Sequence, residues 1–105
     1  MRVILDESVP RRVKLWLPDH EVRTVLEMGW SGVKNGQLLR LISGCADLFI
    51  TADKNLQFQQ NLGSLEFSVL VLPTNRWKVL ELHREAVTLA VSRAKPGKAA
   101  IITII

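Results

Sequence analysis

The chain has 105 residues, of which 48% are hydrophobic and 23% are charged, and its formal net charge is +4. This length fits one domain over residues 1–105 with its own core, and the hydrophobic content excludes intrinsic disorder. No apolar run reaches the roughly 20 residues of a membrane-spanning helix, and the N-terminus lacks a secretory pattern. The single Cys45 cannot form an internal disulfide. We therefore expect a cytoplasmic protein without a membrane partner. The positive charge suits an anionic partner, or serves solubility alone.

An apolar run that ends in two carboxylates opens the chain. Residues 3–5 are Val-Ile-Leu, an unbroken strand-forming run that is typical of a strand covered on both faces. Asp6 and Glu7 follow directly, and Ser8 is a favourable cap for a helix predicted over residues 10–17. The two acids are therefore expected at the carboxyl end of a buried strand, where open α/β sheets bind ligands.

The rest of the chain alternates predicted strands with predicted helices. The strands are expected at residues 21–25, 47–51, 67–72 and 99–105. The helices are expected at residues 35–42, with Asn35 as the cap, and at 77–94 as one long helix, and residues 55–62 are expected to form a short helix or a turn. This alternation implies right-handed crossovers and an α/β sandwich with a mostly parallel sheet of about five strands between helical layers.

A second strand also runs into a carboxylate. Residues 48–50 are Leu-Phe-Ile, and Asp53 follows three positions later. If the strands are parallel, Asp53 lies at the same edge as Asp6 and Glu7, and oxygen ligands without clustered His or Cys favour Mg²⁺ or Mn²⁺. Asp47 starts the same strand, about 20 Å away at the opposite edge. Glu27, on the loop after the second strand, is a further candidate that can reach the acids.

Cations flank both acidic segments. Arg11 and Arg12 begin the helix after the first strand, and Lys54 is next to Asp53. These side chains can hold the phosphates of a nucleic acid, or they can form solvated surface. His20 and His83 are far apart in sequence, and no phosphate-binding glycine motif is present.

Two stretches resemble a known family. Val3-Ile4-Leu5-Asp6-Glu7-Ser8-Val9-Pro10 resembles the hydrophobic-D-E-N-L/V-P signature of small PIN-like proteins, compact relatives of PIN-domain nucleases that are often toxins of bacterial toxin–antitoxin pairs. Residues 47–55 resemble the family's later D-hydrophobic-T-x-D-x-D/N segment, and the middle of the chain from His20 to Leu39 also fits.

The resemblance implies a Rossmann-like, PIN-type three-layer sandwich and a metal-dependent endoribonuclease that cuts single-stranded RNA. Asp6 would be the first acid, Glu7 the adjacent glutamate and Asp53 the late acid, and together they would bind Mg²⁺ or Mn²⁺. Asn35 and Asn55 stand where the family often has acids, and their carbonyl oxygens would assist in holding the metal. The implied partners are RNA and a cognate antitoxin protein.

Other readings of the residues remain open. The two amides at acid positions also suit a non-catalytic PIN-like module that binds RNA or a protein. A third reading is a phosphatase or a nucleotide-binding α/β domain. The apolar C-terminal run, residues 100–105, predicts an edge strand that pairs with a second copy of the chain, giving a homodimer, or with an antitoxin.

Overall fold

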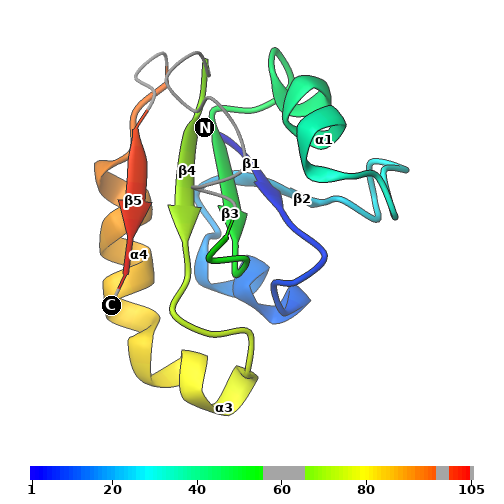
Figure 1. Cartoon of the computed structure of the whole chain (residues 1–105). Coiled ribbons are helices and arrows are strands. Elements are labelled where there is room, and N and C mark those ends of the chain that lie inside the picture. The colour runs from blue at the N-terminus through cyan, green and yellow to red at the C-terminus, as the bar shows by residue number, and fades with distance from the viewer. Residues whose placement is uncertain (56–65, 97–99, 105) are drawn as a thin grey trace.

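A computed structural model describes residues 1–55, 66–96 and 100–104, and shows strands alternating with helices (Figure 1). The strands are β1 (Arg2–Leu5), β2 (Glu21–Thr24), β3 (Leu48–Thr51), β4 (Ser68–Val71) and β5 (Ile101–Thr103). The helices are the 3-10 helix η1 (Arg11–Trp16), α1 (Asn35–Ile42), α3 (Trp77–Leu80), the 3-10 turn η3 (Glu81–His83) and α4 (Arg84–Arg93). The short helix or turn predicted at 55–62 lies, beyond residue 55, outside the described residues.

The sheet has five strands in the order β2-β1-β3-β4-β5, and every neighbouring pair is parallel. The predicted α/β class and the parallel sheet are therefore confirmed. This order is one of the common orders of doubly wound sheets. β2 lies next to β1 on one side, and β3 lies next to β1 on the opposite side. The carboxyl ends of β1 and β3 thus form a topological switch point, the usual place for a ligand in such sheets.

Helices cover both faces of the sheet (Figure 1). Successive strand residues point to opposite faces, so Val3 and Leu5 join one core cluster while Ile4 joins the other. The first cluster packs the sheet against η1, α3 and α4, and the second packs it against α1. Burial on both faces explains why residues 3–5 and 48–50, in β1 and β3, are unbroken apolar runs in the sequence. No helix in the described residues has the length and apolar character needed to cross a membrane.

The segment predicted as a helix over residues 10–17 is a six-residue 3-10 helix. Its backbone bonds join Val13 to Pro10 and Leu17 to Lys14. Because side chains three residues apart align in a 3-10 helix, Val13 and Trp16 share the buried face. Leu15, between these two positions, is 76% exposed.

The long helix predicted over residues 77–94 was wrong in its continuity, because the 3-10 turn η3 separates α3 from α4. At this turn the ring nitrogen Nδ1 of His83 lies 3.1 Å from the carbonyl oxygen of Val79. In a regular helix this carbonyl would accept a hydrogen bond from a backbone N–H, whereas here a side chain approaches it. Leu80 in α3 and Val87 and Val91 in α4 are buried in the core.

The helix predicted at 35–42 was correct in its bounds but not in its cap. Lys34 occupies the cap position of α1 and makes no side-chain capping bond, so Asn35 is the first helical residue. Gly44 has a φ of +84°, the left-handed conformation that ends helices, as its position in the sequence predicted.

Candidate functional site

The carboxyl ends of β1 and β3 are joined through the carboxylate of Asp6. The backbone N–H of Asp6 donates to the carbonyl of Ile50 (2.9 Å), which extends the pairing of the two strands by one residue. The hydroxyl of Thr51, the last residue of β3, donates to Asp6 Oδ2 at 2.8 Å. The hydroxyl of Ser8 donates to the same oxygen at 2.8 Å. The half-buried carboxylate is therefore held in one orientation by two hydroxyl groups.

The same two hydroxyls organise the turn that follows β3. Ser8 Oγ accepts a hydrogen bond from the N–H of Ala52 (3.1 Å), and Thr51 Oγ1 accepts one from the N–H of Asp53 (3.0 Å). Asp53 Oδ1 in turn accepts from the N–H of Asn55 (3.0 Å). The Asp6 carboxylate and the backbone of Asp53 are thus connected through Thr51, so the two segments meet at the predicted edge of the sheet.

Sequence reasoning missed the role of both hydroxyl residues. Ser8 was predicted to cap the following helix, but η1 begins after Pro10 without any side-chain cap. Thr51 was assigned no role beyond the strand, although it is fully buried. A usable signal was present, since each acidic segment carries a hydroxyl residue within two positions of its aspartate.

Glu7 is exposed and faces a different loop. Its Oε1 accepts a hydrogen bond from the N–H of Gly32 (2.8 Å), and its Oε2 accepts one from the hydroxyl of Ser31 (3.0 Å). Gly32 has a φ of +80°, a conformation that glycine adopts without strain. Glu7 therefore fastens the loop before α1 to the end of β1.

A groove of about 370 Å³ opens beside these acids, at the carboxyl ends of β1 and β2. Its lining residues come from both strand ends and from the loop that Glu7 holds: Asp6, Glu7, Val9, Arg11, Thr24, Leu26 and Ser31. One cation, Arg11, thus shares the groove with two carboxylates. A ligand with a negative group near Arg11 and a bound cation near Asp6 would match this arrangement of charges.

The other predicted site residues are not among the residues that line this groove. Arg12 lies over the ring of Trp77, at 5.5 Å from its centroid. Lys54 and Asn55 are exposed in the turn that follows β3. Asn35 begins α1, and its side chain lies outside what the structure describes.

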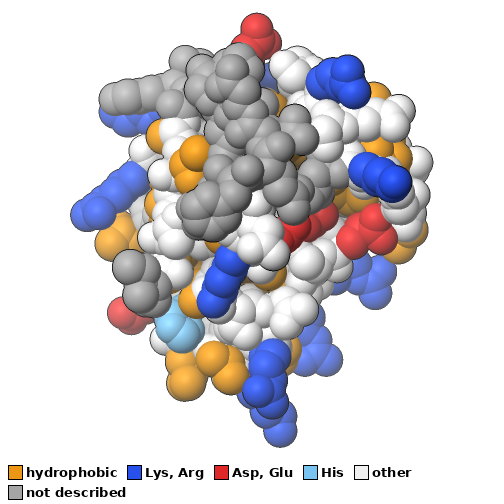
Figure 2. Space-filling view, in the orientation of Figure 1, with side chains coloured by type: hydrophobic (Ala, Val, Ile, Leu, Met, Phe, Trp, Pro, Cys, Tyr) orange, Lys and Arg blue, Asp and Glu red, His pale blue; other side chains and the backbone are white. Residues whose placement is uncertain are grey.

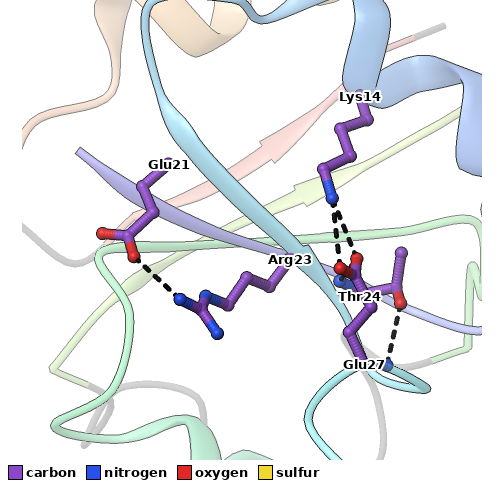
Figure 3. Close-up of polar contacts among 5 residues, drawn as sticks. All are labelled: Lys14, Glu21, Arg23, Thr24 and Glu27. Atoms are coloured by element: carbon purple, nitrogen blue, oxygen red, sulfur yellow. Dashed lines mark hydrogen bonds and ion pairs between the residues drawn. The ribbon is translucent and has the colours of Figure 1, made fainter.

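Glu27, predicted to be able to reach the acids, instead binds Lys14 and Thr24 (Figure 3). Lys14 Nζ donates to both of its carboxylate oxygens, at 3.0 and 3.2 Å, so η1 is tied to the segment after β2. The N–H of Thr24 donates to Glu27 Oε1, and the N–H of Glu27 donates to the Thr24 hydroxyl. The hydrogen bond from Lys14, and then that from Thr24, lowers the pKa of Glu27. Figure 3 also shows the Arg23–Glu21 ion pair on β2.

Asp47 lies at the opposite edge of the sheet, as predicted. Its Oδ2 accepts the N–H of Arg2 at 2.8 Å, and its Oδ1 lies 3.5 Å from the Arg2 guanidinium. The backbone hydrogen bond from Arg2 is the main cause that lowers the pKa of Asp47. Asp47 therefore fixes the start of β3 against β1.

The acids at the switch point fit a divalent cation only as an incomplete set. Within the described residues, no group of three or more His, Cys, Asp or Glu side chains is arranged to hold a metal ion. The Asp6 carboxylate and the backbone N–H of Asp53 share the Thr51 hydroxyl, so the two acids lie in neighbouring segments, and carboxylate oxygens suit hard cations. Mg²⁺ is commonly bound by one or two carboxylates together with phosphates of the substrate, so these two residues fit an ion that a phosphate ligand completes.

The fold and the groove define an α/β protein with a parallel, doubly wound sheet and a charged groove at the carboxyl ends of β1 and β2, next to the switch point between β1 and β3. A scan against protein-family models, a search of curated proteins and a search of solved structures each gave no match. Function is therefore inferred from the residues and geometry of this chain.

Proposed function

We propose that this chain is a metal-dependent endoribonuclease of PIN-like type that acts on single-stranded RNA. The observation that carries the proposal is the network at the switch point, in which the Thr51 hydroxyl links the Asp6 carboxylate to the Asp53 segment beside a groove that contains Arg11. Two acid-bearing strand ends and one arginine are what a phosphodiester and a divalent cation require together.

Asp6 and Asp53 would hold Mg²⁺ or Mn²⁺, with Asn35 and Asn55 as supporting oxygen ligands. When bound, the ion lowers the pKa of a coordinated water and stabilises the negative charge that develops on the phosphodiester. Ser8 and Thr51 fix the Asp6 carboxylate, so that little ordering of this side chain is needed when the ligand binds.

The cations have distinct places in the proposal. Arg11 lines the groove and would hold the phosphate nearest to Asp6. Lys54, exposed in the turn after β3, would contact the backbone on the other side of the acids. The Glu7 carboxylate accepts hydrogen bonds from Ser31 and Gly32. Glu7 would bind the metal ion only after these two hydrogen bonds had broken.

The test is cleavage of single-stranded RNA by the purified protein with Mg²⁺ or Mn²⁺. Asp6→Asn and Asp53→Asn each remove a carboxylate, and Asp19→Asn is the matched control because Asp19 is an exposed turn residue. We expect the first two to lower the rate by at least about 100-fold, since losing even a residue that only supports a metal ligand costs about 10- to 100-fold. If the double variant Asp6→Asn/Asp53→Asn cuts RNA as fast as Asp19→Asn, the proposal is wrong.

A specific observation favours a second candidate, a non-catalytic PIN-like module that binds RNA or a protein. The carboxylate of Glu7 is occupied by the 31–32 loop, which leaves Asp6 and Asp53 as the acids of the network. This candidate expects no metal-dependent cleavage and no rise in melting temperature when Mn²⁺ is added. Calorimetric titration of Mn²⁺, with and without RNA, separates the two candidates.

The resemblance to PIN-like proteins extends the proposal to a cellular role as the toxin of a toxin–antitoxin pair, with a cognate antitoxin as partner. Induced expression of the wild-type chain in bacteria would then arrest growth, whereas the Asp6→Asn variant would not. Equal growth of both strains at equal protein levels would contradict the toxin role.

A further inference from the structure

Two tryptophans from distant parts of the chain stack on each other, and an arginine covers each of them. The rings of Trp16, in η1, and Trp77, at the start of α3, have centroids 5.2 Å apart and planes inclined by 27°. The Arg12 guanidinium lies 5.5 Å from the Trp77 ring centroid. The Arg84 guanidinium lies 5.9 Å from that of Trp16. We refer to these four residues as the Arg–Trp cluster.

The two arginines are exposed and available to a ligand. Ion pairs in the described part of the chain involve Arg2, Lys14 and Arg23, and neither arginine of the cluster takes part in them. Stacking on an indole orients a guanidinium but leaves the N–H groups at its edge able to donate. A side chain that is already ordered loses less conformational entropy when it binds a ligand.

The Arg–Trp cluster lies at the same end of the sheet as the groove. η1 follows β1, and α3 follows β4, so both begin beyond the carboxyl ends of parallel strands (Figure 1). Arg11, which lines the groove, directly precedes Arg12. Figure 2 shows Lys and Arg side chains at the lower end of the molecule, where Figure 1 places α3. Cationic side chains are therefore present both at the groove and at the end of the molecule that carries α3.

We propose that the Arg–Trp cluster is a subsite for single-stranded nucleic acid, in which Arg12 and Arg84 bind backbone phosphates next to the one held in the groove. This inference rests on the proposed function, because it assigns the groove to RNA. The indole occupies one face of the Arg12 guanidinium, and the exposed side chain can receive an unpaired base on the other. An acidic peptide would use only the N–H edges, so the geometry favours a strand with both bases and phosphates.

The test measures binding in the absence of metal, so that no cleavage interferes. A fluorescently labelled 12-nucleotide uridine RNA is titrated in EDTA at several salt concentrations, and affinity is read from anisotropy. The variants are Arg12→Gln, Arg84→Gln and Arg12→Lys, with Arg40→Gln as the control because Arg40 is an exposed arginine of α1, on the other face of the sheet. The substituted side chains are all exposed, so the folded core is retained.

We expect Arg12→Gln and Arg84→Gln to weaken binding by about fivefold or more and to reduce the salt slope by about 0.7 for each phosphate that the protein no longer neutralises. Arg12→Lys would keep the salt slope but lose affinity, because an ammonium keeps the charge without the stacking plane. An abasic strand with the same number of phosphates would bind wild type more weakly than the uridine strand does.

Two results would overturn the subsite. One is binding by Arg12→Gln and Arg84→Gln with the affinity and salt slope of Arg40→Gln. The other is equal competition by polyglutamate of matched charge, which would indicate an acidic-peptide surface. Failure of the ribonuclease proposal looks different: RNA then binds through the cluster, but the wild-type protein with Mg²⁺ or Mn²⁺ leaves it intact.

Discussion

Replacing Thr51 by valine tests whether the network at the switch point holds the sheet together. Valine has nearly the same shape as threonine but lacks the hydroxyl that donates to Asp6 Oδ2 and accepts from the N–H of Asp53. Thr51 is fully buried, so water cannot readily replace the missing hydroxyl at this position. The substitution therefore removes two hydrogen bonds without opening a cavity.

The loss of stability expected for Thr51→Val is large for the removal of a single hydroxyl group. A hydrogen bond to a charged group contributes about 1.5–3 kcal/mol, and one between neutral groups contributes about 0.5–1.5 kcal/mol. The free energy of unfolding should therefore fall by about 2–4 kcal/mol, out of a typical total of about 5–15 kcal/mol. In a domain of this size the melting temperature would fall by about 8 °C or more.

Urea unfolding and thermal melts of three variants measure this effect. Thr51→Ser keeps the hydroxyl and loses only a methyl group, so it should cost about 1 kcal/mol. Thr103→Val is the matched control, because Thr103 is an exposed strand residue of β5 and its replacement should change stability by less than about 0.5 kcal/mol. Equal stability of Thr51→Val and Thr103→Val would refute the role of the hydroxyl, as would a larger loss for Thr51→Ser than for Thr51→Val.

Three further predictions concern pH, the loop before α1 and assembly. The hydrogen bond from the Arg2 N–H is the main cause that lowers the pKa of Asp47 below its ordinary value of 3.8. The contribution of Asp47 to stability is therefore present above pH 3.8 and is lost as the pH falls through the lower pKa of the folded state. In Asp47→Asn, the free energy of unfolding measured in urea should depend less on pH in that acid range. Glu7→Gln should speed amide hydrogen exchange at Gly32, because a neutral amide accepts a weaker bond than a carboxylate. The chain should form a homodimer through the edge strand β5, and Ile101→Lys should shift light scattering at micromolar concentration toward the monomer.

Each of these has a control and a contrary result. Asp19→Asn should leave the acid profile unchanged, and an unaltered profile in Asp47→Asn would contradict the assignment. Glu85→Gln, an exposed helical residue, should not affect exchange in the loop, whereas equal effects of the two glutamine variants would remove the special role of Glu7. A wild-type chain that is monomeric throughout the micromolar range would rule out the dimer.

The order of strands and helices could be predicted because the central strands β1, β3 and β4 are buried on both faces. Residues 3–5 and 48–50 are unbroken apolar runs, and only a parallel sheet between two helical layers buries such runs completely. The break between α3 and α4 could not be predicted, because it depends on interactions within a single turn. His83 approaches the carbonyl of Val79 in three dimensions, and hydrophobic spacing alone carries no information about that approach.

The candidate site was predictable in its acids but not in their surroundings. Asp6 and Asp53 follow buried strands, so a parallel sheet necessarily brings their segments to one edge. The hydroxyls of Ser8 and Thr51 looked like a helix cap and an ordinary strand residue, because short-range patterns describe each segment alone. Besides a partner in its own segment, each hydroxyl has a partner in the other segment, 44 residues away for Ser8 and 45 residues away for Thr51.

Arg11 and Arg12 show how local geometry separates residues that the sequence presents as equivalent. In a 3-10 helix successive side chains point about 120° apart, so two adjacent arginines cannot face the same ligand atom. Arg11 faces the groove, while Arg12 faces Trp77 of a helix that is more than sixty residues further along the chain. An α-helix over residues 10–17, as predicted, would have turned the two side chains differently. The short 3-10 helix thus gives each arginine its own place, one beside the acids and one at the stacked tryptophans, and a strand that engages both must pass from the groove toward α3.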